Sequence, residues 1–145
     1  MVLPEIIFKA NFTNMNDKQK VFVVDDDASA RKGIARLVRA AGYNVCAYAS
    51  ANEFLTTLNP TISGCVVLDV RMPGISGEDL ATKLMDYRDK LSIIFVTADD
   101  DPSIKQKAKK LGATGFFRKP VDGTALLDAI NWSINEYDAK NHPTP

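Results

Sequence analysis

Short apolar runs alternate with amphipathic segments along the chain, and this alternation predicts the fold class. Runs predicted as strands cover residues 21–24, 43–49, 65–69, 91–97 and 114–118. Such runs, bounded by turn residues, are typical of strands buried on both faces of a parallel sheet. Segments with apolar spacing of three and four residues predict helices over about 28–41, after residue 50, over 77–89 and 102–111, and from residue 122 onward. Five strands and five helices in alternation predict an α/β domain with helices on both faces of its sheet.

Capping signals mark where several of these helices begin. Ser50 and Glu53 have the spacing of a capping box, and Asp101 followed by Pro102 is a typical helix start. The helix over 77–89 is expected to direct Leu80, Leu84 and Met85 inward.

Composition narrows the function classes. The chain has 145 residues, and 18 Lys and Arg balance 18 Asp and Glu, so no net charge favours binding of nucleic acid or an acidic membrane by this segment. No apolar run is long enough to span a bilayer or to form a signal peptide, which predicts a cytoplasmic location. Cys46 and Cys65 are expected to be buried free thiols. We expect an extension over 1–19, one domain over 20–138 and a tail or linker over 139–145.

Polar residues stand at the carboxyl ends of four predicted strands. They are Asp25 and Asp26, Asp69, Thr97 and Lys119. Because parallel strands end at one edge of a sheet, these side chains are expected to face the same edge. Close carboxylates there repel each other by about 4 kcal/mol per pair at an effective dielectric near 20. A hard divalent cation relieves that repulsion, and all-oxygen ligands favour Mg²⁺, with Mn²⁺ as an alternative.

This combination of groups is typical of phosphoryl transfer to a carboxylate nucleophile: carboxylates, Mg²⁺, a lysine and a threonine hydroxyl. The chain has no Walker-type glycine loop, so these residues do not imply a bound nucleotide. Taken alone, an Asp at a strand end often only caps a loop or a helix. The four strand ends considered together favour the chemical interpretation for Asp69.

The chain resembles the receiver domains of bacterial two-component response regulators over roughly residues 20–136. The resemblance rests on four motifs in the order and spacing of that family: VVDDD at 23–27, LDVRMPGISG at 68–77, VTA at 96–98 and FFRKP at 116–120. The second string is most similar to receivers that usually carry helix-turn-helix output domains. The resemblance implies a flavodoxin-like (βα)5 fold with strand order 2-1-3-4-5.

The resemblance also implies a role for each matching residue. Asp69 corresponds to the phosphoacceptor, and the metal positions correspond to Asp25, Asp26, Asp69 and the backbone carbonyl of Arg71. The phosphate-binding positions correspond to Lys119 and Thr97, the switch residues are Thr97 and Phe116, and a cis bond is expected before Pro120. Without the motif set, Thr97 would merely end a strand and Phe116 would be an ordinary core residue.

The predicted function is therefore that of a phosphoacceptor in two-component phosphorelay signalling, not that of an enzyme acting on a metabolite. A sensor histidine kinase or a histidine phosphotransfer protein would donate a phosphoryl group to Asp69. Phosphorylation would alter the surface of the fourth helix, fifth strand and fifth helix, which would bind an output partner or a second copy of the chain. The cognate kinase, the output and the phosphate lifetime are not encoded in these motifs.

Two alternatives remain open. The first is a small Mg²⁺-dependent phosphatase or phosphotransferase with an aspartyl nucleophile, which needs a substrate pocket that short connections do not offer. The second is a receiver that no longer accepts phosphate and acts only in docking, which the intact motif residues disfavour. Additional carboxylates near the site are expected to tune metal affinity or to disfavour anionic donors. They are Asp27, Asp99, Asp100 and Asp101.

Overall fold

The computed structural model describes residues 19–141, with side chains up to Glu136. The predicted extension over 1–19 therefore lies outside the described residues, apart from Gln19. Helix α6 continues to Asn141, so its last turn covers the beginning of the segment predicted as a tail.

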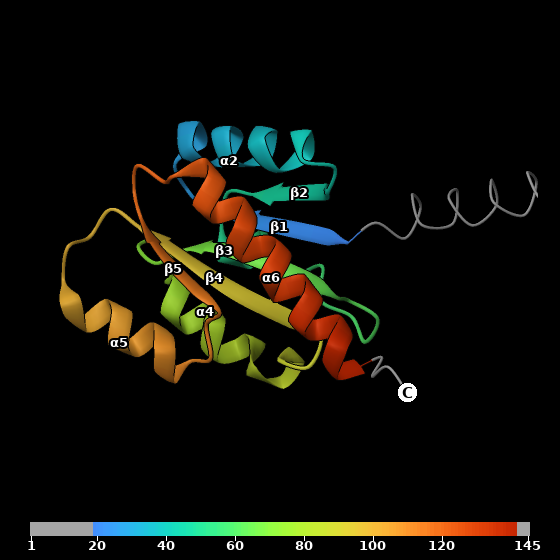
Figure 1. The fold of residues 1–145 in the computed structure, drawn as a ribbon. Helices are drawn as coiled ribbons and strands as arrows, with labels where there is room; N and C mark the ends of the chain where they lie inside the picture. The colour runs from blue at the N-terminus through green and yellow to red at the C-terminus, as the bar shows by residue number, and fades with distance from the viewer. Residues whose placement is uncertain (1–18, 142–145) are drawn as a thin grey trace, which may run out of the picture.

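A five-stranded parallel sheet forms the centre of the molecule (Figure 1). The strands are β1 (Lys20–Val24), β2 (Asn44–Tyr48), β3 (Gly64–Asp69), β4 (Leu91–Thr97) and β5 (Gly115–Arg118). Their order in the sheet is β2-β1-β3-β4-β5, and every neighbouring pair is parallel. The predicted flavodoxin-like fold and strand order are confirmed.

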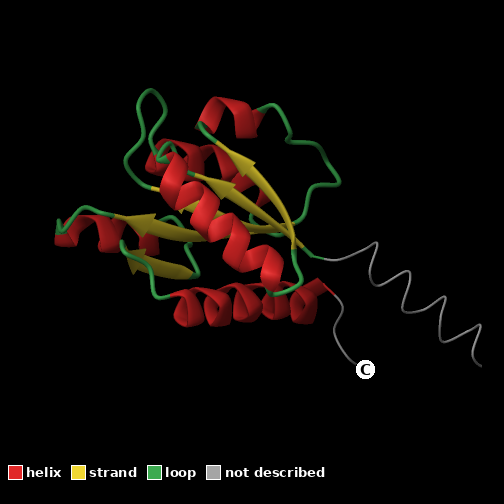
Figure 2. Cartoon of the chain, turned by 90° about the horizontal axis from the view of Figure 1, so that it is seen from above, coloured by secondary structure: helices red, strands yellow, loops and turns green. Residues whose placement is uncertain are grey.

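Helices cover both faces of this sheet (Figure 2). The helices are α2 (Ala28–Ala40), α3 (Ala51–Leu55), α4 (Gly77–Lys83), the 3₁₀ helix η1 (Leu84–Tyr87), α5 (Pro102–Lys110) and α6 (Gly123–Asn141). The predicted caps are present, because Asp101 accepts from the Ser103 N–H, and Ser50 accepts from the Glu53 N–H. The Glu53 carboxylate closes the second cap by accepting from the Ala49 N–H.

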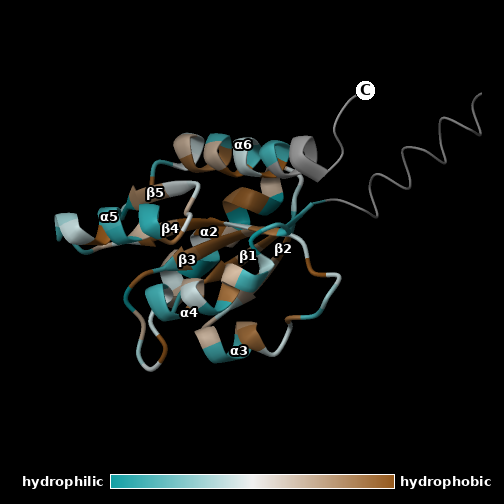
Figure 3. Cartoon of the chain, turned by 90° about the horizontal axis from the view of Figure 1, so that it is seen from below, coloured by the Kyte–Doolittle hydropathy of each residue, from teal (hydrophilic) through white to brown (hydrophobic). Residues whose placement is uncertain are grey.

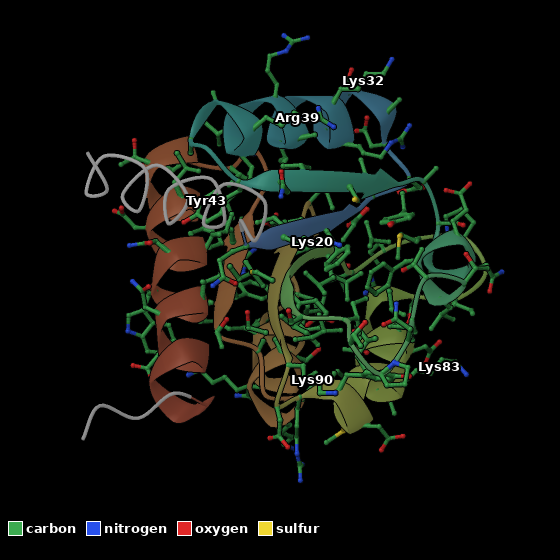
Figure 4. All side chains as sticks on the ribbon, turned by 90° about the vertical axis from the view of Figure 1, so that its right-hand side faces the viewer. Lys20, Lys32, Arg39, Tyr43, Lys83 and Lys90 are labelled. Carbon is green, nitrogen blue, oxygen red and sulfur yellow. The ribbon has the colours of Figure 1, made fainter. Side chains whose placement is uncertain are left out.

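Two hydrophobic clusters pack on opposite faces of the sheet. One joins the strands to α2 and α6 through side chains such as Val38 and Ile130, and the other joins them to α3, α4 and α5 through side chains such as Phe54 and Ile104. Figure 3 shows the hydrophobic residues concentrated in the strands between the helices. Lys32 and Arg39 lie on the outer side of α2 (Figure 4). The sheet is thus fixed from both sides, which makes the carboxyl ends of its strands a rigid platform.

Strand β2 differs from its neighbours because it lies at the edge of the sheet. Cys65 in β3 is buried, as predicted, but Cys46 in β2 is exposed, and the prediction that both thiols are buried is wrong for Cys46. Cys46 lines a surface pocket of about 470 Å³ beside the loop that joins α3 to β3. Both cysteines are free, in agreement with the prediction.

The predicted helix over 77–89 is divided into two parts. Helix α4 ends at Lys83, and the 3₁₀ helix η1 continues the chain to Tyr87. Leu80 and Leu84 are buried as predicted, whereas Met85 is 38% exposed, so its predicted inward position is wrong. Met85 follows Leu80 by five residues, which places it about 140° around an α-helix from Leu80, and the larger rotation per residue of the 3₁₀ turn adds to this angle.

Among residues 19–141, no helix is both long enough and apolar enough to cross a membrane.

Candidate functional site

The site begins where β1 and β3 end side by side. Val24 pairs with Leu68 in the parallel register, so the residues that follow them, Asp25 and Asp69, emerge next to each other. Together with Asp26, they place carboxylate oxygens within 4.8 Å of one another. Asp25 is 1% exposed and Asp69 is 4% exposed, whereas Asp26 faces solvent. The predicted carboxylate cluster is therefore real, and it opens to solvent on the side of Asp26.

Lys119 supplies a positive charge to the two buried carboxylates. Its Nζ atom lies 2.7 Å from Oδ2 of Asp25 and 3.6 Å from Oδ2 of Asp69. Oδ2 of Asp25 is buried, and the Lys119 ammonium group is its ionic partner. The peptide bond between Lys119 and Pro120 is cis. One ammonium group thus faces two buried carboxylates, which leaves negative charge uncompensated.

The pKa of Asp69 reflects this excess of negative charge. Burial, followed by the neighbouring Asp25 carboxylate, raises the pKa of Asp69 to about 7, although the Lys119 ammonium opposes the shift. The same carboxylates raise the pKa of Lys119 above its ordinary value against the opposing effect of burial, which is the largest single influence on it. Lys119 therefore stays charged at neutral pH, and the ionised form of Asp69 is held at a cost in free energy.

Local contacts hold the buried Asp25 in place. Oδ1 of Asp25 accepts a hydrogen bond from the Asp27 N–H at 2.9 Å, and the Asp25 carbonyl accepts one from Nη1 of Arg31 at 2.8 Å. Asp27, predicted as an additional carboxylate of the site, caps α2 by accepting from the N–H groups of Ser29 and Ala30. Its carboxylate is therefore committed to the start of this helix.

Gly77 allows α4 to begin directly against the Asp69 backbone. Its N–H donates to the Val70 carbonyl at 2.9 Å, and a Cβ atom at this position would lie 2.2 Å from the Asp69 carbonyl oxygen. No side chain fits in that space. Gly77 therefore fixes the path of the chain as it leaves Asp69.

Thr97 ends β4, and its neighbour Val96 pairs in register with Asp69. The Thr97 side chain is completely buried, and its Oγ1 atom accepts a hydrogen bond from the Asp99 N–H at 3.0 Å. Phe116 lies in β5 opposite Phe95, partly buried against the cluster that includes α5. The structure thus places Thr97 at the same sheet edge as the carboxylates, and Phe116 further back in the neighbouring strand.

Arg71 follows Asp69 by two residues, and its N–H donates to Oδ1 of Asp69 at 3.3 Å. Its guanidinium group points elsewhere: Nε lies 2.9 Å and Nη2 2.8 Å from Oδ2 of Asp99. The prediction assigned Arg71 a role only through its backbone carbonyl, and it did not foresee this ion pair.

The donor set fits a hard divalent cation. Three carboxylates supply only oxygen atoms, which suits Mg²⁺ better than softer metals. The two buried carboxylates share the single Lys119 ammonium group, and this provides a site-specific reason for a further cation, because buried negative charge that is only partly compensated is costly. An acidic cluster of this kind is typical of a Mg²⁺ site.

A metabolite-processing enzyme would need a substrate pocket at the nucleophile. Two surface pockets of the described chain, of about 570 and 470 Å³, are lined by other residues, and neither includes Asp25, Asp26 or Asp69. The larger one lies at the opposite edge of the sheet, between η1 and α6, and includes Ser92 at the start of β4. Neither pocket therefore supports the predicted alternative of a small phosphatase.

A family model for the response regulator receiver domain matches residues 21–131. Nodulation protein W of Bradyrhizobium diazoefficiens is 42% identical over 118 residues, which cover 81% of this chain and 52% of that protein. Transcriptional regulatory protein TdiR of Thauera aromatica is 40% identical over 122 residues, which cover 84% of this chain and 54% of that protein. The chain thus spans about half the length of these relatives.

Solved structures agree with the sequence matches. The response regulator StyR has a TM-score of 0.78 at 42% identity, over 86% of this chain and 63% of that one. FixJ-N has a TM-score of 0.74 at 32% identity, over 81% of this chain and 94% of that one. The chain belongs to the response regulator receiver family, and its acidic pocket is consistent with the phosphoacceptor site of a two-component receiver. It is therefore a signalling domain rather than a classical enzyme.

Sequence reasoning missed two contributors to the site, Arg31 and Gly77, and it did not predict that Asp99, expected as an additional carboxylate, pairs with Arg71. The sequence does contain a signal for Gly77. The turn after Asp69 already has a glycine at Gly74, so a second glycine at the start of the next helix indicates a close backbone contact there. Arg31 had a weaker one, since its place in the first turn of α2 brings it near the end of β1. The pairing of Asp99 with Arg71 spans 28 residues and leaves no periodic pattern in the sequence.

Proposed function

We propose that Asp69 accepts a phosphoryl group from a phosphohistidine of a sensor histidine kinase or a histidine phosphotransfer protein. The observation that carries this proposal is the buried cluster of Asp25 and Asp69 with a single lysine ammonium between them. A carboxylate held beside excess negative charge has a raised pKa and is a strong nucleophile once ionised.

In the proposed transfer, an Oδ atom of ionised Asp69 attacks phosphorus while the phosphorus–nitrogen bond to the donor imidazole breaks. The imidazole nitrogen keeps the bonding electrons and takes up a proton, and Asp69 becomes an acyl phosphate. Water later attacks the same phosphorus, so that inorganic phosphate leaves and the Asp69 carboxylate is restored. Mg²⁺ bound at this site supplies positive charge that neutralises the transferring phosphoryl oxygens.

This chain's residues have distinct tasks in that reaction. Asp25, Asp26, Asp69 and the backbone carbonyl of Arg71 would hold the cation, because three of them already converge at the end of β1 and β3. Lys119 would bind a phosphoryl oxygen, since its ammonium lies 3.6 Å from Oδ2 of Asp69. As the ammonium is preorganised, it stabilises developing negative charge without reorganisation.

The Thr97 hydroxyl would donate a hydrogen bond to the phosphoryl group, and Phe116 would change position in response. Thr97 and Phe116 lie on β4 and β5, which flank α5 in the chain, so the surface formed by α5, β5 and α6 would change. That face contains both charge signs, including Lys105, Arg118 and Asp122. It would bind an output partner or a second copy of the chain more tightly after phosphorylation, and the names of the relatives favour a transcriptional output.

The direct test is intact-mass spectrometry after incubation with Mg²⁺ and phosphoramidate. We expect the wild type to gain one phosphoryl group and Asp69→Asn to gain none. Asp99→Asn is the matched control, because it removes a carboxylate from the same sheet edge outside the buried cluster, and it should still be phosphorylated. Equal modification of Asp69→Asn and the wild type would refute the assignment of Asp69.

A second measurement addresses the switch. Amide hydrogen exchange is compared in free protein and in protein treated with beryllofluoride, which mimics a phosphoryl group on the carboxylate. We expect changes over residues 97–118 as well as around Asp69. Changes confined to the loop after Asp69 would leave phosphate acceptance intact but remove this route to output.

A further inference from the structure

The loop between β4 and α5, residues 98–101, is held to the phosphoacceptor loop by one residue, Asp99. The Asp99 carboxylate uses both of its oxygens. Oδ2 accepts from Nε and Nη2 of Arg71 at 2.9 and 2.8 Å, and Oδ1 accepts from the Asp101 N–H at 2.9 Å. Asp101 in turn caps α5, so the Arg71–Asp99 ion pair connects the loop after Asp69 with the start of α5.

The same residue also holds the Thr97 hydroxyl. The Asp99 N–H donates to Oγ1 of Thr97 at 3.0 Å, and Thr97 is completely buried. A shift of the Asp99 backbone therefore acts directly on the hydroxyl that the proposed function brings to the phosphoryl group. Because Arg71 restrains the Asp99 carboxylate, it also restrains this backbone.

The backbone of Arg71 contacts Asp69, whereas its guanidinium group contacts Asp99. Its N–H already donates to Oδ1 of Asp69 at 3.3 Å, and its side chain is 63% exposed, so little packing opposes a change of its rotamer. A phosphoryl group carries more negative charge than a carboxylate and accepts two parallel hydrogen bonds from a guanidinium group. Phosphorylated Asp69 therefore competes with Asp99 for the same arginine.

We propose that Arg71 exchanges partners, from the Asp99 carboxylate in the unphosphorylated domain to the phosphoryl group on Asp69, and that this exchange releases the β4–α5 loop. The inference rests on the proposed function and extends it to two positioning residues. In the unphosphorylated domain the Arg71–Asp99 ion pair holds Thr97 through the Asp99 backbone. After phosphorylation the loop loses this restraint on Thr97, while Arg118 of β5 still holds it through the Asp100 carboxylate and the Asp99 and Asp100 carbonyl oxygens.

The chain contains a matched control in the neighbouring residue. Asp100 lies in the same loop and pairs with Arg118 of β5, with 2.7 Å between Oδ1 and Nη1. Asp100→Asn removes the same charge from the same loop as Asp99→Asn, but it leaves the Arg71–Asp99 pair and the Thr97 hydrogen bond intact. Any effect that arises only from weaker repulsion of an anion should appear equally in both variants.

The test is a beryllofluoride titration in Mg²⁺ with four proteins besides the wild type: Asp99→Asn, Asp100→Asn, Arg71→Gln and the double variant Arg71→Gln/Asp99→Asn. Asn retains the Oδ1 acceptor for Asp101 but loses the charge that holds Arg71. We expect Asp99→Asn to bind roughly two- to five-fold more tightly than Asp100→Asn, the range of an exposed ion pair. Arg71→Gln should bind more weakly than the wild type, and the double variant should match Arg71→Gln.

Amide exchange in metal-free protein supplies a readout that does not depend on phosphoryl chemistry. Exchange at residue 99 should be faster in Asp99→Asn and in Arg71→Gln than in the wild type, and less affected in Asp100→Asn, which keeps the Arg71–Asp99 pair. Equal tightening by Asp99→Asn and Asp100→Asn, or tightening that persists in the Arg71→Gln background, would overturn the partner exchange alone. Failure of the wild type to bind beryllofluoride would overturn the proposed function and this inference with it.

Discussion

Two groups of aspartates lie at the carboxyl ends of the strands, and their negative charge is stabilised in different ways. Asp25 and Asp69 are buried and share a single ammonium group, that of Lys119. Asp99 and Asp101, in the β4–α5 loop, accept hydrogen bonds from backbone N–H groups and, at Asp99, from Arg71. The first group has one positive charge for two buried carboxylates, whereas the second is exposed and stabilised by hydrogen bonds from backbone N–H groups.

The pKa values of the two groups move in opposite directions for this reason. Burial and the neighbouring Asp25 raise the pKa of Asp69 to about 7. Hydrogen bonds from backbone N–H groups are the main cause that lowers the pKa of Asp99 and of Asp101 below the ordinary value. An acidic residue at this edge is therefore reactive or structural according to its burial and its donors, and not according to its type.

The largest loss of stability is expected at Gly77, where α4 begins against the backbone of Asp69. Gly77→Ala would place a Cβ atom 2.2 Å from the Asp69 carbonyl oxygen, so α4 or β3 must shift. We expect the free energy of unfolding to fall by about 3 kcal/mol. Gly33→Ala is the control, because nothing lies within 4 Å of its Cβ position in the middle of α2, and it should stabilise the fold by about 0.5–1 kcal/mol. Urea unfolding measures both, and similar free energies for the two variants would contradict the tight contact at Gly77.

The next largest difference in stability is expected when the positively charged side chain of each group is replaced. Lys119→Met leaves two buried carboxylates without their ammonium group, and we expect a loss of about 2–3 kcal/mol in the free energy of unfolding at pH 8. Arg71→Met breaks an ion pair whose arginine is 63% exposed, so its loss should be much smaller. Urea unfolding of both variants without Mg²⁺ tests this order, and an equal loss would show that the buried group is not the more strained one.

The pH dependence of stability should differ in sign between the two groups. The folded pKa of Asp69, about 7, lies above its unfolded value of about 4, so the stability it contributes is present below pH ~4 and is lost as the pH rises through about 7. Asp69→Asn removes this loss. Without Mg²⁺ it should be more stable than the wild type by about 1–2 kcal/mol at pH 8, a value reduced for solvent screening, and the difference should shrink toward pH 4.

Asp99 behaves in the opposite way, because its folded pKa lies below the unfolded value. Its contribution is present above pH ~4 and is lost as the pH falls through its folded pKa. Thermal unfolding between pH 3 and pH 8 should therefore show Asp99→Asn less stable than the wild type at neutral pH, with the difference vanishing in acid. If Asp69→Asn and Asp99→Asn shifted stability in the same direction at pH 8, the contrast would be wrong.

Much of the site at the carboxyl ends of the strands was predictable, because buried strands appear in the sequence as continuous apolar runs. The run from Cys65 to Leu68 predicted β3 and put Asp69 at its end, and the same logic placed Asp25 after β1. Their proximity followed from the strand order that the resemblance implied, and the structure confirmed it. The contact with Lys119 followed from the same order, since β5 ends at the same edge.

The exposed features were not predictable in this way. The Arg71–Asp99 pair depends on rotamers of two side chains that lie on different loops, and solvent-exposed loops carry no hydrophobic period. Met85 was misplaced because it follows Leu80 by five residues, a spacing that puts the two side chains on different faces of a helix. Cys46 was misplaced because an apolar run does not show whether its strand lies at the centre or at the edge of a sheet.

The central claim is that the buried group requires a divalent cation and that the exposed carboxylates of the β4–α5 loop, Asp100 among them, do not. Its most direct test is the melting temperature measured against Mg²⁺ concentration for the wild type, Asp26→Asn and Asp100→Asn. Binding to the native state should raise the melting temperature of the wild type and of Asp100→Asn alike, and the rise should largely disappear in Asp26→Asn. A melting temperature independent of Mg²⁺ in the wild type, or an equal rise in all three proteins, would contradict the claim.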